Sequence, residues 1–132
     1  MQLTRAPLLA LALIAAQGRA ADAQSVSPLR KEGTTFTQRK AFYVNVGNPY
    51  RRAMTFRLRT VEADFSTPAP GSVVRPDTLR LGANRTKRVV VAFTIPEGSR
   101  ERQIVLCVEP EGIEGPVQPR VCGTYTGRRI GR

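Results

Sequence analysis

The sequence contains no histidine and no tryptophan, and only two of its 132 residues are cysteines. Histidine is the commonest general base near neutral pH, so its absence removes the usual means of acid–base catalysis. The acidic residues form no paired-carboxylate motif, and neither a Gly-x-Ser-x-Gly sequence nor a phosphate-binding glycine-rich loop occurs. We therefore expect a protein that binds rather than catalyses, with no catalytic residues and no cofactor.

The two cysteines, Cys107 and Cys122, lie in separate segments with β-strand character. Two thiolates without histidine leave a zinc ion short of ligands, so we expect no metal site. In an oxidising compartment a disulfide is the favoured interpretation. It would close a loop of about 15 residues and stabilise the domain by roughly 3 kcal/mol. Two buried free thiols are the alternative.

Residues 1–23 have the pattern of a secretory signal peptide. One positive charge precedes an apolar run over residues 6–16, and Ala21 and Ala23 supply the small residues that a signal peptidase reads. The run is too short to span a bilayer, which needs about 20 apolar residues. We expect cleavage after Ala23, with the site after Ala20 as the alternative, and no membrane span in the mature chain. A non-cleaved anchor, or a helix packed on the domain, is the other interpretation.

Positive charge dominates the composition. The formal net charge is +11, and +10 remains when Arg5, Arg19 and Asp22 are removed with the signal peptide. A field of this sign attracts anionic surfaces such as lipopolysaccharide, phospholipid headgroups or acidic proteins. Nucleic acid is not expected as a partner, because few aromatic residues lie among the basic positions to stack on bases. A solvated basic surface without a ligand is the alternative.

Apolar and polar residues alternate with period two along the mature chain, and turn signals separate the runs. In the clearest runs, Phe42, Val44 and Val46 share one face, and the β-prone segment 87–95 is expected to be a central strand. The segment 31–38 is polar and predicted to be a turn. The runs predicted as strands are 25–30, 40–46, 53–60, 72–75 with 78–81 around Pro76, 87–95, 102–109 and 117–126.

About seven short strands predict an all-β, immunoglobulin-like sandwich formed by one domain, residues 24–132, with a short basic C-terminal tail. The tryptophan and the widely separated cysteine pair of antibody domains are absent. The cysteines instead join the last two predicted strands. If these strands form a hairpin around the loop 110–116, Cys107 and Cys122 can lie opposite each other and brace a sheet edge.

Several segments carry a resemblance to a known family. They are 25–30 (SVSPLR), 43–49 (YVNVGNP), 74–81 together with 88–96, and Arg100-Glu101 at the start of a strand. In order and spacing they resemble the N-terminal domain of periplasmic pilus chaperones of the PapD type. The resemblance implies an immunoglobulin-like domain whose last strand adds to an exported subunit at a sheet edge. We do not expect the second domain of that family, or the cleft between the two domains, in this sequence.

The resemblance also implies site residues. A basic pair of the family anchors the terminal carboxylate of the subunit, and Arg30 or Lys31 falls near its first member, while no lysine matches the second. The candidate partner-strand edge consists of Val117, Arg120, Val121, Gly123 and Tyr125.

These observations predict an exported chaperone-like or assembly-accessory protein that binds an extended segment of a secreted or pilus-type subunit. The alternative is an envelope-associated structural module held by positive charge to anionic lipid or lipopolysaccharide.

Overall fold

The computed structural model describes residues 25–131, so the predicted signal peptide, residues 1–23, lies outside the described residues. The described part contains strands and no helix, and therefore no helix that is long and apolar enough to cross a membrane. The strands are β1 (Ser25–Ser27), β2 (Arg30–Thr35), β3 (Arg39–Gly47), β4 (Met54–Val61), β5 (Ser72–Arg75), β6 (Thr78–Leu81), β7 (Thr86–Thr94), β8 (Glu101–Pro110) and β9 (Val121–Arg129).

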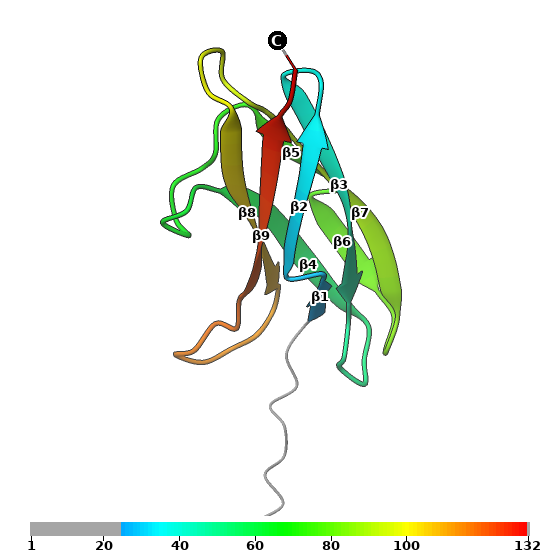
Figure 1. Cartoon of the computed structure of the whole chain (residues 1–132). Coiled ribbons are helices and arrows are strands. Elements are labelled where there is room, and N and C mark those ends of the chain that lie inside the picture. The colour runs from blue at the N-terminus through cyan, green and yellow to red at the C-terminus, as the bar shows by residue number, and fades with distance from the viewer. Residues whose placement is uncertain (1–24, 132) are drawn as a thin grey trace, which may run out of the picture.

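The strands form two sheets that pack face to face (Figure 1). Sheet A has the order β1-β3-β7-β5, and sheet B has the order β2-β9-β8-β4-β6. Neighbouring strands are antiparallel except β2 and β9, which are parallel. This arrangement confirms the predicted all-β, immunoglobulin-like sandwich.

Alternating side chains of both sheets fill the space between them, as expected for strands with one buried face. Phe42, Val44 and Val46 are buried as predicted, and β7 is a central strand. The ring of Phe42 lies 6.1 Å from that of Phe93 and 6.0 Å from that of Tyr125, centroid to centroid, so residues of both sheets meet in one aromatic cluster.

The prediction for residues 25–38 is wrong. Residues 25–30 form two strands rather than one, and the predicted turn contains β2. The peptide bond between Ser27 and Pro28 is cis, and the chain crosses there from sheet A, where β1 pairs with β3, to sheet B, where β2 pairs with β9. Proline has no N–H to donate to a ladder, which is consistent with a break at this position. The polar sequence of β2 suits an edge strand, since most of its side chains are exposed.

The disulfide between Cys107 and Cys122 is confirmed, with an S–S distance of 2.12 Å. The two residues face each other in the β8–β9 ladder with their Cα atoms 4.1 Å apart, as the hairpin interpretation predicts. The bridge lies on the outer face of sheet B, where it packs with Val61 and Val105 in a second, smaller apolar cluster.

Candidate functional site

The last strand differs from its predicted form in two ways. It begins at Val121, so Val117 and Arg120 lie in the loop 111–120 that precedes it. From Thr124 onward β9 has two neighbours, because β2 pairs with residues 124–129 on the side away from β8. The prediction of a sheet edge along the whole strand is therefore wrong: β2 occupies the edge of sheet B, and the fully buried Tyr125 lies in the interior.

The first three residues of β9 keep the character of an edge. Residues 121–123 pair with 106–108 of β8, whereas the ladder with β2 begins only at Thr124. The Thr124 N–H donates to the Leu29 carbonyl at 2.8 Å, and main-chain groups of alternate residues point to the same side of a strand. The N–H and C=O of Cys122 therefore point toward the side on which β2 has not yet begun.

The loop before this segment is exposed and offers an apolar side chain. Val117 has an exposed fraction of 75%. Two hydrogen bonds restrain the loop. The Gln118 side-chain amide donates to the Ile113 carbonyl within the loop at 2.8 Å, and the Arg120 guanidinium donates to the Phe65 carbonyl of the neighbouring loop at 2.9 Å. The loop 111–120, which is exposed and partly restrained, therefore leads directly into residues 121–123, the part of β9 that pairs with β8 but not with β2.

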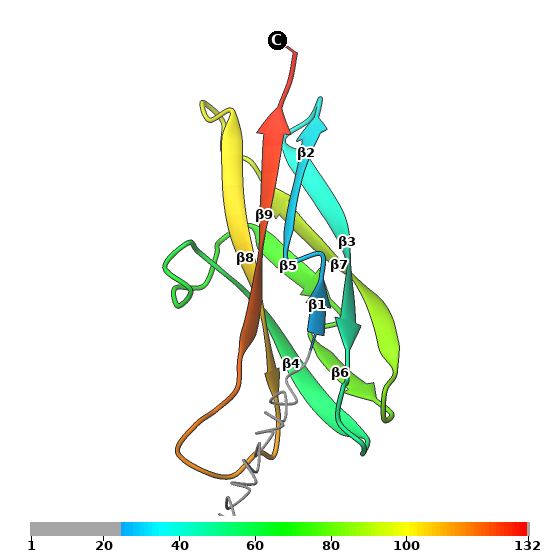
Figure 2. The same ribbon diagram turned by 60° about the horizontal axis from the view of Figure 1, so that its bottom comes forward.

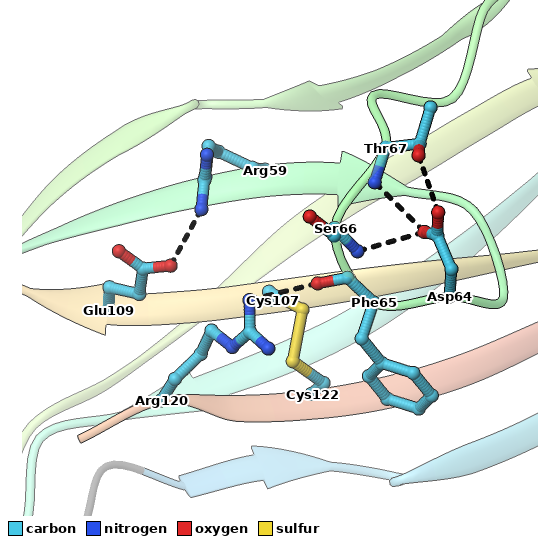
Figure 3. Close-up of a disulfide and its surroundings, with 9 residues drawn as sticks. All are labelled: Arg59, Asp64, Phe65, Ser66, Thr67, Cys107, Glu109, Arg120 and Cys122. Atoms are coloured by element: carbon cyan, nitrogen blue, oxygen red, sulfur yellow. Dashed lines mark hydrogen bonds and ion pairs between the residues drawn. A yellow bond between two sulfur atoms is a disulfide. The ribbon is translucent and has the colours of Figure 1, made fainter. Parts of the chain in front are cut away.

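The loop that receives Arg120 is ordered by Asp64 (Figure 3). One carboxylate oxygen accepts hydrogen bonds from the backbone N–H groups of Ser66, at 2.9 Å, and Thr67, at 2.8 Å, and the Thr67 hydroxyl donates to the other oxygen. These bonds, led by the one from the Thr67 side chain, lower the pKa of Asp64. The start of β9 is therefore held by a disulfide and by a pre-shaped neighbouring loop.

Two of the predicted edge residues have a packing role. The Tyr125 hydroxyl donates to the Pro28 carbonyl at 2.7 Å, which ties β9 to the point where the chain changes sheets, and burial raises the pKa of Tyr125. A Cβ atom at Gly123 would lie 2.5 Å from the Tyr125 hydroxyl oxygen. Glycine at position 123 therefore makes room for the tyrosine.

The predicted anion anchors point to different faces of β2. Arg30 lies on the outer face opposite Thr124, and Lys31 lies on the inner face opposite Tyr125. The ammonium group of Lys31 is 5.9 Å from the centroid of the Phe42 ring, and that of Lys40 is 5.0 Å from the same centroid. The structure thus gathers Lys31 and Lys40 around one aromatic ring, and neither lysine has an ion pair with an acidic residue among residues 25–131.

Lys40 is the residue that sequence reasoning missed. Its aliphatic part passes over two glycines that are register partners, Gly33 and Gly127: a Cβ atom at Gly127 would lie 3.0 Å from Lys40 Cβ, and one at Gly33 would lie 2.8 Å from Lys40 Cε. No local sequence pattern indicates this arrangement, because it depends on the pairing of 30–35 with the last strand, which places Gly33 beside Gly127. The two lysines could hold a carboxylate or another small anion. Among residues 25–131, no group of three or more possible metal ligands occurs.

The comparisons with solved structures give a consistent result. The E. coli chaperone DraB matches with a TM-score of 0.65 and 20% identity over 81% of this chain. The complex of the Salmonella enterica pilin SafA with the SafB chaperone matches with a TM-score of 0.65 and 19% identity over 84%. The fold is PapD-like. A PapD-like domain of human CEP192 also matches, with a TM-score of 0.63 and 14% identity over 84% of this chain and 87% of that domain.

The chain spans about half the length of the bacterial proteins that it matches, 55% of DraB and 56% of the matched chain of the SafA–SafB complex. No model of a protein family matches the sequence, and no curated protein matches it. The predicted likeness to PapD-like pilus chaperones is confirmed at the level of the fold.

Proposed function

We propose that this protein is an exported, periplasmic, chaperone-like or assembly-accessory protein that binds an extended segment of another exported protein. The segment pairs with the beginning of β9, residues 121–123, and contacts the loop before it at Val117. The observation that carries the proposal is the stagger of sheet B: the β8–β9 ladder reaches Val121, but the β2–β9 ladder begins only at Thr124. A strand that is paired on one side can accept another on its open side.

A pair of lysines farther along β9 supports the proposal, since Lys31 is the register partner of Tyr125 and Lys40 lies beside Gly127. Lys31 and Lys40 flank Phe42 at the side of the sandwich where β2 forms the edge of sheet B. A carboxylate of the bound partner would gain two cationic neighbours there. The PapD resemblance implies such a basic pair, with Arg30 or Lys31 as its first member. Of these two we assign Lys31, because Lys40 lies beside the same ring and can act as the second member.

The similar structures support a partner of the subunit class. Three of them carry the names of complexes in which a chaperone binds a pilin or a tip subunit. Because this chain covers only about half of those chaperones, the proposal is restricted to an accessory that uses one immunoglobulin-like domain for binding.

The test is native isolation from the cell envelope, followed by mass spectrometry of the polypeptide that copurifies and by amide hydrogen exchange of the complex. We expect a stoichiometric exported polypeptide and slower exchange at residues 117–123 than in the free protein. Val117→Asp should weaken its retention by about tenfold or more, since a carboxylate in the contact would lose its hydration. The matched control is Thr78→Asp, which adds the same charge on β6, an exposed edge position at the opposite side of sheet B.

Retention that is lost with Thr78→Asp but kept with Val117→Asp would move the partner to β6 and overturn the assignment of the edge. An exported protein that is isolated with no polypeptide bound, at both low and high salt, would contradict the proposed function itself.

A further inference from the structure

Acidic and basic residues are distributed unequally over the two sheets. No acidic residue occurs in any strand of sheet A, or in the two turns 48–53 and 82–85 at one end of it. The basic residues of this part are Lys40, whose side chain lies over the ring of Phe42, and a second group that we call the basic face: Arg39, Arg51, Arg52, Arg75, Arg85, Lys87 and Arg88. The acidic residues of the described chain all lie in sheet B or in the other loops.

The ion pairs follow the same division. Every ion pair among residues 25–131 joins residues of sheet B or of the loops next to it, such as Arg59 with Glu109 at 2.8 Å and Arg128 with Glu101 at 3.0 Å. None of them involves the basic face. Its positive charges are therefore not neutralised by a neighbouring carboxylate in the described part of the protein.

A buried asparagine holds the two turns of the basic face together. The Asn48 side-chain amide donates to the carbonyls of Arg52 at 2.9 Å, Leu81 at 3.0 Å and Gly82 at 3.1 Å, and its backbone N–H donates to the Arg85 carbonyl at 2.8 Å. The two turns consequently project side by side from one end of the sandwich (Figure 2). The side chains of Arg51, Arg52 and Arg85 are exposed there.

The outer face of sheet A adds an amphipathic aromatic residue to these cations. Tyr43 has an exposed fraction of 61%, and the guanidinium of Arg88 lies 5.1 Å from the centroid of its ring. In the ladder, Tyr43 is opposite Val90, which is opposite Arg75 of β5. Exposed tyrosine beside arginine is typical of surfaces that meet the headgroup region of a membrane, where the ring contacts apolar material and the hydroxyl stays in water.

We propose that the basic face binds anionic phospholipid headgroups. Projecting turns and an open sheet face suit a planar array of phosphates better than an enclosed ligand, and arginine donates two parallel hydrogen bonds to a phosphate. The loop 111–120 projects on the other side of the same end of the molecule in both views (Figures 1 and 2). Binding to a membrane through the basic face would leave the proposed partner edge accessible, and neither proposal depends on the other.

The test is sedimentation of the purified protein with vesicles of phosphatidylcholine alone and of phosphatidylcholine mixed with phosphatidylglycerol. Each basic residue at an anionic surface contributes about fivefold to binding. The triple variant Arg51→Gln, Arg52→Gln, Arg85→Gln should therefore bind the phosphatidylglycerol vesicles on the order of a hundredfold more weakly. The control variant Arg57→Gln, Arg59→Gln, Arg128→Gln removes the same charge from sheet B and should lose less than about fivefold.

Binding should also fall steeply as salt rises from about 50 to about 200 mM, while the thermal unfolding midpoint of the triple variant stays unchanged. Equal loss by both variants would show that net charge alone is responsible and would overturn the assignment to the basic face. Failure to bind phosphatidylglycerol vesicles at low salt, with retained binding of polyglutamate that depends on Arg51, Arg52 and Arg85, would identify an acidic protein as the partner and overturn the lipid proposal.

Discussion

Sheet A and sheet B bury similar apolar side chains on their inner faces, but their outer faces are built differently. On sheet B, a disulfide, the apolar pair Val61 and Val105 and a set of ion pairs connect neighbouring strands. Among the described residues, the outer face of sheet A has no ion pair and no acidic residue. The contacts beyond the main-chain ladder are concentrated on the sheet that contains β9.

This difference has a physical reason in the topology. In sheet A, the central strands β3 and β7 pair with each other over nine residues, and this long ladder fixes their register. The beginning of β9 has one neighbour over residues 121–123 and follows a loop of ten residues. A segment of this kind frays unless side chains hold it. We infer that the crosslink and the loop contacts keep an exposed strand end in an extended conformation.

The largest effect should come from removing the crosslink of sheet B. The disulfide joins residues separated by 15 positions, and its loss should lower the free energy of unfolding by about 3 kcal/mol. The variant Cys107→Val, Cys122→Ala keeps an apolar side chain at the buried position 107, and urea unfolding measures the change. The reduced wild-type protein should be destabilised to a similar extent, whereas equal stability of the oxidised and crosslink-free forms would contradict the importance of the bridge.

The next effect concerns the end of sheet A. Asn48 is buried, and its side-chain amide satisfies three carbonyl groups that bridge the two turns. Asn48→Ala leaves these acceptors without that donor and should lower the free energy of unfolding by about 2 kcal/mol. The control is Asn45→Ala, on the outer face of the preceding strand. A loss for Asn48→Ala no greater than that for the control would show that the turns do not depend on the buried amide.

Much of the sandwich could be predicted because its central strands have one buried face. Phe42, Val44 and Val46 alternate with exposed residues, and the same period marks 53–60 and 87–95. The disulfide was predictable for a related reason. Two cysteines in consecutive strands joined by a turn-rich loop can face each other across a hairpin, and they do.

The edge strand could not be predicted from local pattern. β2 has exposed residues on both faces, so no apolar alternation marks it, and its parallel partner lies at the other end of the chain. The pairing of Gly33 with Gly127 becomes evident only in three dimensions. For the same reason the sequence indicated Arg30 or Lys31 as an anchor without Lys40, and it placed Tyr125 at an edge although the structure buries it completely.

The smallest effect should come from Asp64, whose hydrogen bonds order the loop 64–67 beside sheet B. Hydrogen bonds from Thr67 and Ser66 hold the pKa of Asp64 below its ordinary value of 3.8. Because the pKa is lower in the folded protein than in the unfolded chain, ionised Asp64 favours folding at all pH values above about 4, and this contribution disappears as the pH falls through the folded-state pKa. Asp64→Asn cannot titrate, so the difference in unfolding free energy between wild type and variant should be constant from about pH 7 to pH 5 and should shrink below about pH 4.

Urea unfolding at a series of pH values measures this difference, with Asp77→Asn as the control for loss of an aspartate whose side chain forms no such turn. A difference that stays constant down to about pH 2 would mean that the carboxylate does not order the loop. The start of β9 would then be held in place by the disulfide and by the hydrogen bond of Arg120 to the Phe65 carbonyl.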